Sequence, residues 1–131
     1  MLYDRIAARR NAPFHVQVEL TDLPTDPPEN YVRIGGAVVR VFRSDGTLNF
    51  GDSVSFEVWV CSRGKEPTGP RYVYHQDLVG MGHVEAYLDG KPPDCGFVGY
   101  EYTLVPGPSE QPTLTLGELN AARKWWQFWK S

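Results

Sequence analysis

The chain has little cysteine, no long apolar run and no excess of positive charge, and each absence excludes some classes of protein. Two cysteines in 131 residues, Cys61 and Cys95, are too few for a disulfide framework, so we expect reduced thiols. No run approaches the length of a membrane span, and the N-terminal segment lacks the apolar core of a signal peptide. These absences predict a cytoplasmic protein without a transmembrane segment.

Basic residues are scarce where most of the predicted sheet lies. The net charge is −3, and residues 44–120 carry eleven acidic but only four basic side chains. Phosphate binding needs clustered Lys and Arg, so this distribution argues against a nucleic-acid surface. The sequence also lacks a GxSxG motif, a P-loop and a CxxC pair, which are common signatures of enzymes and metal sites.

Strict alternation of apolar and polar residues is the strongest positive signal. In residues 53–61 the side chains of Val54, Phe56, Val58 and Val60 share one face, which indicates a half-buried strand. Turns are supported by eleven prolines and thirteen glycines. The Gly35–Gly36 pair predicts a bulge or a sharp coil within its strand. The other predicted strands cover residues 14–21, 32–42, 72–77, 83–88 and 97–105.

These patterns predict one all-β domain over residues 1–131. We expect a small antiparallel barrel, OB-like in its order of elements, or a sandwich of about six strands, and both architectures stay open. The parts are an N-terminal arm or short helix at 1–12, a β core at 13–105 and a C-terminal helix at 115–130. Side chains expected to be almost fully buried are Val16, Val18, Phe56, Val58, Val60 and Val84.

One polar constellation has residue types suited to chemistry. If strands 72–77 and 83–88 pair as a hairpin, His75 lies opposite Glu85 and Asp77 lies opposite His83. Such a face is typical of cross-strand charge pairs. The same four side chains are also suited to a divalent metal, or to acid–base catalysis near neutral pH. No other cofactor is indicated.

Aromatic residues form a second candidate surface. Tyr31, Trp59 and Tyr87 are expected on an outer sheet face, where Cys61 is also expected. Four further tyrosines are expected to line the interior or a cleft, either as core or as a surface that stacks bases or sugars. These four are Tyr72, Tyr74, Tyr100 and Tyr102.

The C-terminus concentrates large rings in five residues. Trp126 and Trp129 continue a helical apolar stripe, whereas Trp125 and Phe128 point elsewhere. We expect either a homo-oligomer contact, most simply a dimer, or wrapping of all four rings onto the core. Docking of a protein partner and adsorption to a membrane surface are further alternatives.

Three functions are therefore considered. The first is a non-enzymatic binding or protein-interaction module that oligomerises. The second is a small metal-dependent or acid–base enzyme that uses His75, Asp77, His83 and Glu85. The third is an OB-like binder of single-stranded nucleic acid, which the acidic middle of the chain disfavours. The absence of a catalytic signature favours the first.

Overall fold

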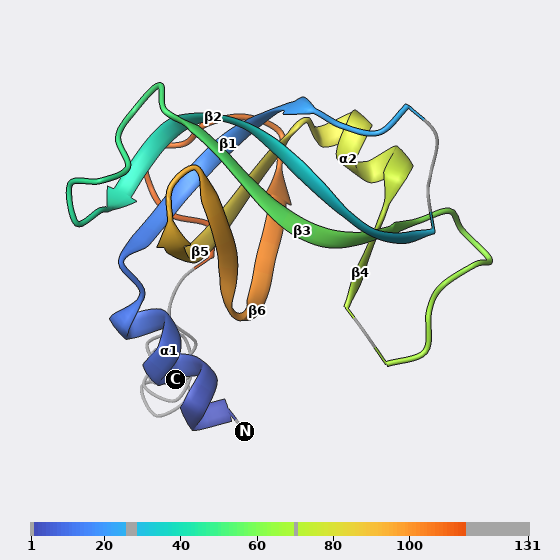
Figure 1. The fold of residues 1–131 in the computed structure, drawn as a ribbon, viewed down its shortest axis with the longest axis horizontal. Helices are drawn as coiled ribbons and strands as arrows, with labels where there is room; N and C mark the ends of the chain where they lie inside the picture. The colour runs from blue at the N-terminus through green and yellow to red at the C-terminus, as the bar shows by residue number, and fades with distance from the viewer. Residues whose placement is uncertain (1, 26–28, 70, 115–131) are drawn as a thin grey trace, which may run out of the picture.

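The computed structural model describes residues 2–25, 29–69 and 71–114, and it is mostly β. Along the chain the elements are α1 (Leu2–Asn11), β1 (Phe14–Asp22), β2 (Asn30–Arg43), β3 (Ser53–Cys61), β4 (Tyr72–Tyr74), α2 (His75–Met81), β5 (His83–Lys91) and β6 (Asp94–Val105) (Figure 1). The strands form one sheet in the order β2-β1-β5-β6-β3-β4. The all-β class is confirmed, and of the two alternatives left open for the N-terminal segment, an arm or a short helix, the structure has the helix.

Strand β2 pairs with two neighbours because it is longer than either. Its C-terminal part pairs with β1, its N-terminal part pairs with β3, and Gly35, Gly36 and Ala37 pair with both. Along its other edge β1 pairs with β5, and β5 pairs in turn with β6. Strands β3 and β6 then meet at a single parallel bridge between Ser55 and Asp94. The pairings therefore run in a ring through β1, β2, β3, β6 and β5.

The glycine pair permits the close approach of three strands. A Cβ atom on Gly36 would lie 1.8 Å from the carbonyl oxygen of Glu19, and one on Gly35 would lie 2.6 Å from that of Val54. Only glycine avoids both collisions. The ladder between β1 and β2 shifts register opposite this pair. The irregularity predicted at the two glycines is confirmed.

The inward faces of the strands pack into one apolar core. All six side chains predicted to be buried are at most 4% exposed. Phe56 is fully buried, and its ring centroid lies 4.8 Å from that of Phe97 on β6. A smaller cluster of Ala12, Tyr87 and Val98 lies on the outside of the sheet. Alternation alone thus identified which face of β3 is buried.

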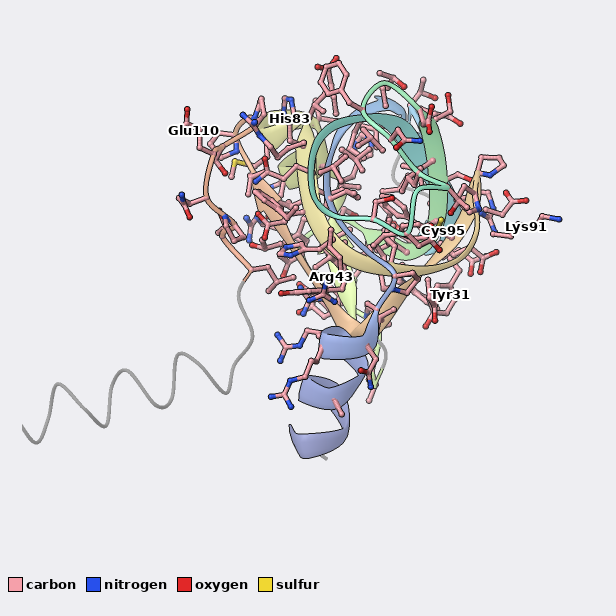
Figure 2. All side chains as sticks on the ribbon, turned by 90° about the vertical axis from the view of Figure 1, so that its left-hand side faces the viewer. Tyr31, Arg43, His83, Lys91, Cys95 and Glu110 are labelled. Atoms are coloured by element: carbon pink, nitrogen blue, oxygen red, sulfur yellow. The ribbon has the colours of Figure 1, made fainter. Side chains whose placement is uncertain are left out.

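The C-terminal end of α1 is fixed to the sheet by Arg43. Its Nη1 atom donates to the backbone oxygens of Arg9, Arg10 and Ala12 at distances of 2.8, 2.9 and 3.0 Å. Figure 2 labels Arg43 directly above this helix. A cation at the end of a helix satisfies carbonyl groups that have no partner within the helix.

The predicted strand at 72–77 is wrong beyond Tyr74. Residues 75–81 form α2, which buries Leu78 and ends at Gly82 in the left-handed conformation, with φ of 71°. Glycine adopts this conformation without strain, so it ends the helix and turns the chain into β5. The hairpin expected between 72–77 and 83–88 therefore does not form.

Two predictions about outer faces also need correction. Cys61 is fully buried, because β4 pairs alongside the end of β3, and Tyr87 is 2% exposed because it packs against Ala12. Both Cys61 and Cys95 are free thiols, and burial raises the pKa of each. Neither described helix has the length and apolar character needed to span a bilayer. The predicted helix at 115–130 lies outside the described residues.

We predict that Phe56→Ala lowers the free energy of unfolding by about 3–5 kcal/mol, through lost burial and a residual cavity. Chemical denaturation measures this change. Phe50→Ala is the matched control, because Phe50 is 74% exposed and its truncation should change stability by less than about 0.5 kcal/mol. A loss below about 1 kcal/mol for Phe56→Ala would contradict the core assignment.

Candidate functional site

The structure separates the four polar residues that sequence had grouped. His75 and Asp77 lie on α2, where the Nε2 atom of His75 is 2.7 Å from the backbone oxygen of Pro24. Asp77 is half exposed and lies 3.8 Å from Arg63. His75 therefore connects the helix to the loop after β1, whereas Asp77 makes a surface ion pair.

The other two members of the group lie on β5 but face different surroundings. His83 approaches Glu19 at 3.7 Å, whereas Glu85 is completely buried beside β1. Within the described parts of the chain, no three His, Cys, Asp or Glu side chains are placed to hold a metal ion. The shared face on which the metal and acid–base hypotheses depended does not form, because 75–81 is helical.

Glu85 is the centre of a buried hydrogen-bond network that sequence did not reveal. It lies directly opposite Gln17 in the ladder between β1 and β5. The Nε2 atom of Gln17 donates to Oε1 of Glu85 at 2.8 Å, and Nε2 of His15 lies 2.9 Å from Oε2. The His15 ring stacks on Tyr87 with a centroid separation of 4.0 Å. These polar side chains occupy the outer face of the sheet.

That outer face is buried by the segment after β6, residues 106–114, which we call the strap. The backbone N–H groups of Thr113 and Leu114 donate to the two carboxylate oxygens of Glu85. Gln17 exchanges two hydrogen bonds with Ser109, at 2.8 Å and 2.9 Å. This segment outside the strands thus completes the coordination of a buried charge.

Two opposing effects set the pKa of Glu85. Burial alone would raise it, but hydrogen bonds from His15, Thr113, Gln17 and Leu114 together outweigh burial, and the pKa lies below its ordinary value of 4.5. Because the carboxylate is charged and receives four donors, its acceptor positions are occupied. The role that this network supports is therefore structural: it holds the strap against the sheet.

A second feature is a cavity of about 240 Å³ between β3 and β6, which we call the aromatic cavity. It lies where these strands separate, since beyond the bridge at Ser55 strand β3 pairs with β4. Its lining combines core side chains with side chains from the outer surface of β2 and β3. The lining residues are Tyr31, Glu57, Val58, Trp59, Arg71, Phe97 and Tyr102.

Two polar groups in this lining lack partners. The indole Nε1 of Trp59 and the hydroxyl of Tyr102 are buried, and neither has a hydrogen-bond partner among the described residues. An unpaired buried polar group costs about 1–3 kcal/mol, so proteins rarely retain one without a reason. Burial raises the pKa of Tyr102, and the Arg71 guanidinium, which lies over the ring but outside hydrogen-bond geometry with the hydroxyl, opposes this rise with a smaller effect. The phenol is therefore protonated at neutral pH and able to donate.

The remaining lining groups shape the mouth of the aromatic cavity. Tyr31 is 53% exposed and meets Trp59 edge to face at 5.0 Å. The Arg71 guanidinium lies 4.1 Å above the ring of Tyr102 and donates to the backbone oxygen of that residue at 2.6 Å. Glu57 is exposed and approaches Arg33 at 4.0 Å. The lining is therefore aromatic, the two uncommitted donors lie beneath its surface, and the charged groups already have partners.

Sequence reasoning partly anticipated this site. It placed Tyr31 and Trp59 together on an outer face and Tyr102 in the interior or a cleft, and the structure brings these three side chains to one cavity. Arg71 was missed, because it precedes a three-residue strand whose parallel pairing with β3 leaves no local signal. No protein-family model matches the chain, and a search of curated proteins finds no similar sequence.

We predict that Glu85→Gln lowers the free energy of unfolding by about 3 kcal/mol at pH 7, because an amide cannot accept all four hydrogen bonds. The depressed pKa of Glu85 contributes stability that is present above pH 4.5 and is lost as pH falls through the folded-state pKa. The difference between wild type and variant should therefore narrow in acid. Denaturation at a series of pH values measures it.

Glu57→Gln is the control for this pH series, since the Glu57 side chain is 64% exposed. Its effect should stay below about 1 kcal/mol at every pH, as for other surface ion pairs. A Glu85→Gln deficit that stays constant from neutral to acid would contradict the assignment of Glu85 as the charged centre of the network.

Proposed function

We propose that this protein is a non-enzymatic binding module whose aromatic cavity receives a group from a longer partner chain. The observation that carries the proposal is the pair of buried, unpartnered polar groups on Trp59 and Tyr102 beside an apolar opening. A bound group with acceptor atoms would satisfy both once small adjustments of the two side chains bring these donors to the cavity surface. Aromatic walls with a few convergent polar groups are typical of binding pockets.

The size of the aromatic cavity supports an anchor pocket. Sites that enclose drug-sized ligands or cofactors usually measure about 300–1,000 Å³. At about 240 Å³, this cavity has room for one or two side-chain-sized groups. A partner would therefore insert a small part of itself here and lie over the neighbouring surface of β2 and β3.

An OB-like barrel is the architecture that we propose for this module. The ring of pairings through β1, β2, β3, β6 and β5 supports it, as does the single parallel bridge that joins β3 to β6. In barrels of this type the face of the second and third strands binds extended ligands. Tyr31 on β2 and Trp59 on β3 lie directly opposite each other on that face.

We predict that a ligand in the aromatic cavity shifts the indole N–H signal of Trp59 in NMR spectra of the ¹⁵N-labelled full chain. Trp59→Phe identifies the signal by removing it. The probes are decaproline, the oligonucleotide dT10 and maltohexaose, which represent extended peptide, single-stranded nucleic acid and sugar. At least one should cause a saturable shift, because the donor is unpaired in the free protein.

Tyr31→Ala should weaken that response about tenfold, through loss of an aromatic anchor worth roughly 1–2 kcal/mol. Phe50→Ala is the matched control, since Phe50 is also an exposed aromatic residue but does not line the aromatic cavity. An unchanged chemical shift of the indole N–H with all three probes would refute the proposed function.

We also propose that the aromatic residues at 125–129 mediate self-association. They are outside the described residues, and the proposal rests on composition: adjacent tryptophans on a helix differ by about 100° in direction, so one packing surface rarely covers both. The full chain should sediment as a dimer at micromolar concentration. The double variant Trp126→Ala/Trp129→Ala should sediment as a monomer, and a monomeric wild type would refute the proposal.

A further inference from the structure

We propose that the partner segment is a proline-rich peptide in the polyproline II conformation, and this inference rests on the proposed function of the aromatic cavity. Such a segment has no internal hydrogen bonds, so every backbone carbonyl is free to accept one. Its proline residues have no backbone N–H and therefore bring no donor that would need an acceptor. The chemistry of the cavity matches both properties.

The polar atoms of the aromatic cavity are donors. The indole N–H of Trp59 can only donate, and the protonated phenol of Tyr102 is also unpaired. The one carboxylate in the lining, Glu57, is at the exposed rim and already faces Arg33. A ligand that presents several acceptors and few donors therefore fits this lining better than a nucleobase or a sugar, which present both.

The arrangement of the aromatic rings points to the same partner. Tyr31 and Trp59 pack edge to face, so together they present the face of one ring and the edge of the other in the lining. Val58 and Phe97 form apolar surface deeper in the aromatic cavity. Apolar pyrrolidine rings pack well in aromatic-lined grooves, and the polyproline II helix loses little conformational entropy on binding because it is already extended.

Charge near the aromatic cavity disfavours a polyanionic partner. Arg71 is held by the backbone oxygen and the ring of Tyr102, and Arg33 lies between Glu57 and Asp94 at 4.0 and 3.6 Å. Binding of a phosphate backbone requires several cations that are free to contact phosphates. An uncharged proline-rich chain has no such requirement.

The test compares decaproline with dT10 and maltohexaose on the same ¹⁵N-labelled full chain. We expect decaproline to shift the Trp59 indole signal saturably, and the other two probes to leave it in place at equal concentration. A saturable shift of the Trp59 signal with dT10 or maltohexaose, and none with decaproline, would overturn the peptide inference and leave the proposed function standing. An equal response to all three probes would also overturn it, and no response at all would overturn both.

Tyr102→Phe provides the sharpest variant, because it removes one buried, unpartnered hydroxyl and keeps the ring. The free protein should be equally or more stable, since no hydrogen bond is lost on substitution. Affinity for decaproline should nevertheless fall about fivefold to tenfold, as expected when a donor to a ligand carbonyl is removed. Unchanged affinity in a folded variant would show that the phenol does not contact the peptide and would overturn this assignment of donors.

Discussion

The burial of one charged carboxylate, that of Glu85, constrains much of the structure around it. A carboxylate removed from water is costly unless its oxygens receive hydrogen bonds. Two of its donors come from His15 and Gln17 on β1, and two come from backbone groups of the strap. The strap must therefore cross β5 and β1. This course also brings Leu114 against Tyr87, close to the end of α1.

A second constraint acts at the glycine pair of β2. Because neither Gly35 nor Gly36 has a side chain, β1 and β3 both approach β2 at this point. Residues 53–60 of β3 pair with β2 along one edge, and along the other edge β3 meets β6 at Ser55 and pairs with β4 further on. The separation of β3 from β6 leaves the aromatic cavity. The aromatic cavity thus lies where β4 replaces β6 as the neighbour of β3.

Much of this fold is predictable from local pattern, because burial on the inner faces follows a period of two. Phe56, Val58 and Val60 were assigned correctly for that reason. The outer faces follow no such rule, since their burial depends on segments distant in sequence. His15 and Gln17 alternate like solvent-exposed residues, yet both are buried. The ring of Tyr87 stacks on His15, and the strap, about 90 residues later in the chain, hydrogen-bonds Gln17. The prediction of a strand at 72–77 was wrong for a different reason. Only the first three residues form a strand, and a helix that ends at Gly82 follows directly. Alternation of apolar and polar residues cannot locate this change from strand to helix.

The Glu85 carboxylate and the polar groups that line the aromatic cavity differ in how they are satisfied. In the view of Figure 2, Glu110 of the strap and Tyr31 of the aromatic cavity lie on opposite sides. On the strap side every oxygen of a buried carboxylate is paired, whereas on the cavity side two polar groups have no partner within the described chain. Folded proteins pair nearly all their buried polar groups, and unpaired ones persist where function requires them. The same sheet can evidently satisfy a buried charge completely. The simpler groups of Trp59 and Tyr102 are not satisfied in this way, which is why we propose the aromatic cavity, and not the more polar network at Glu85, as the binding site.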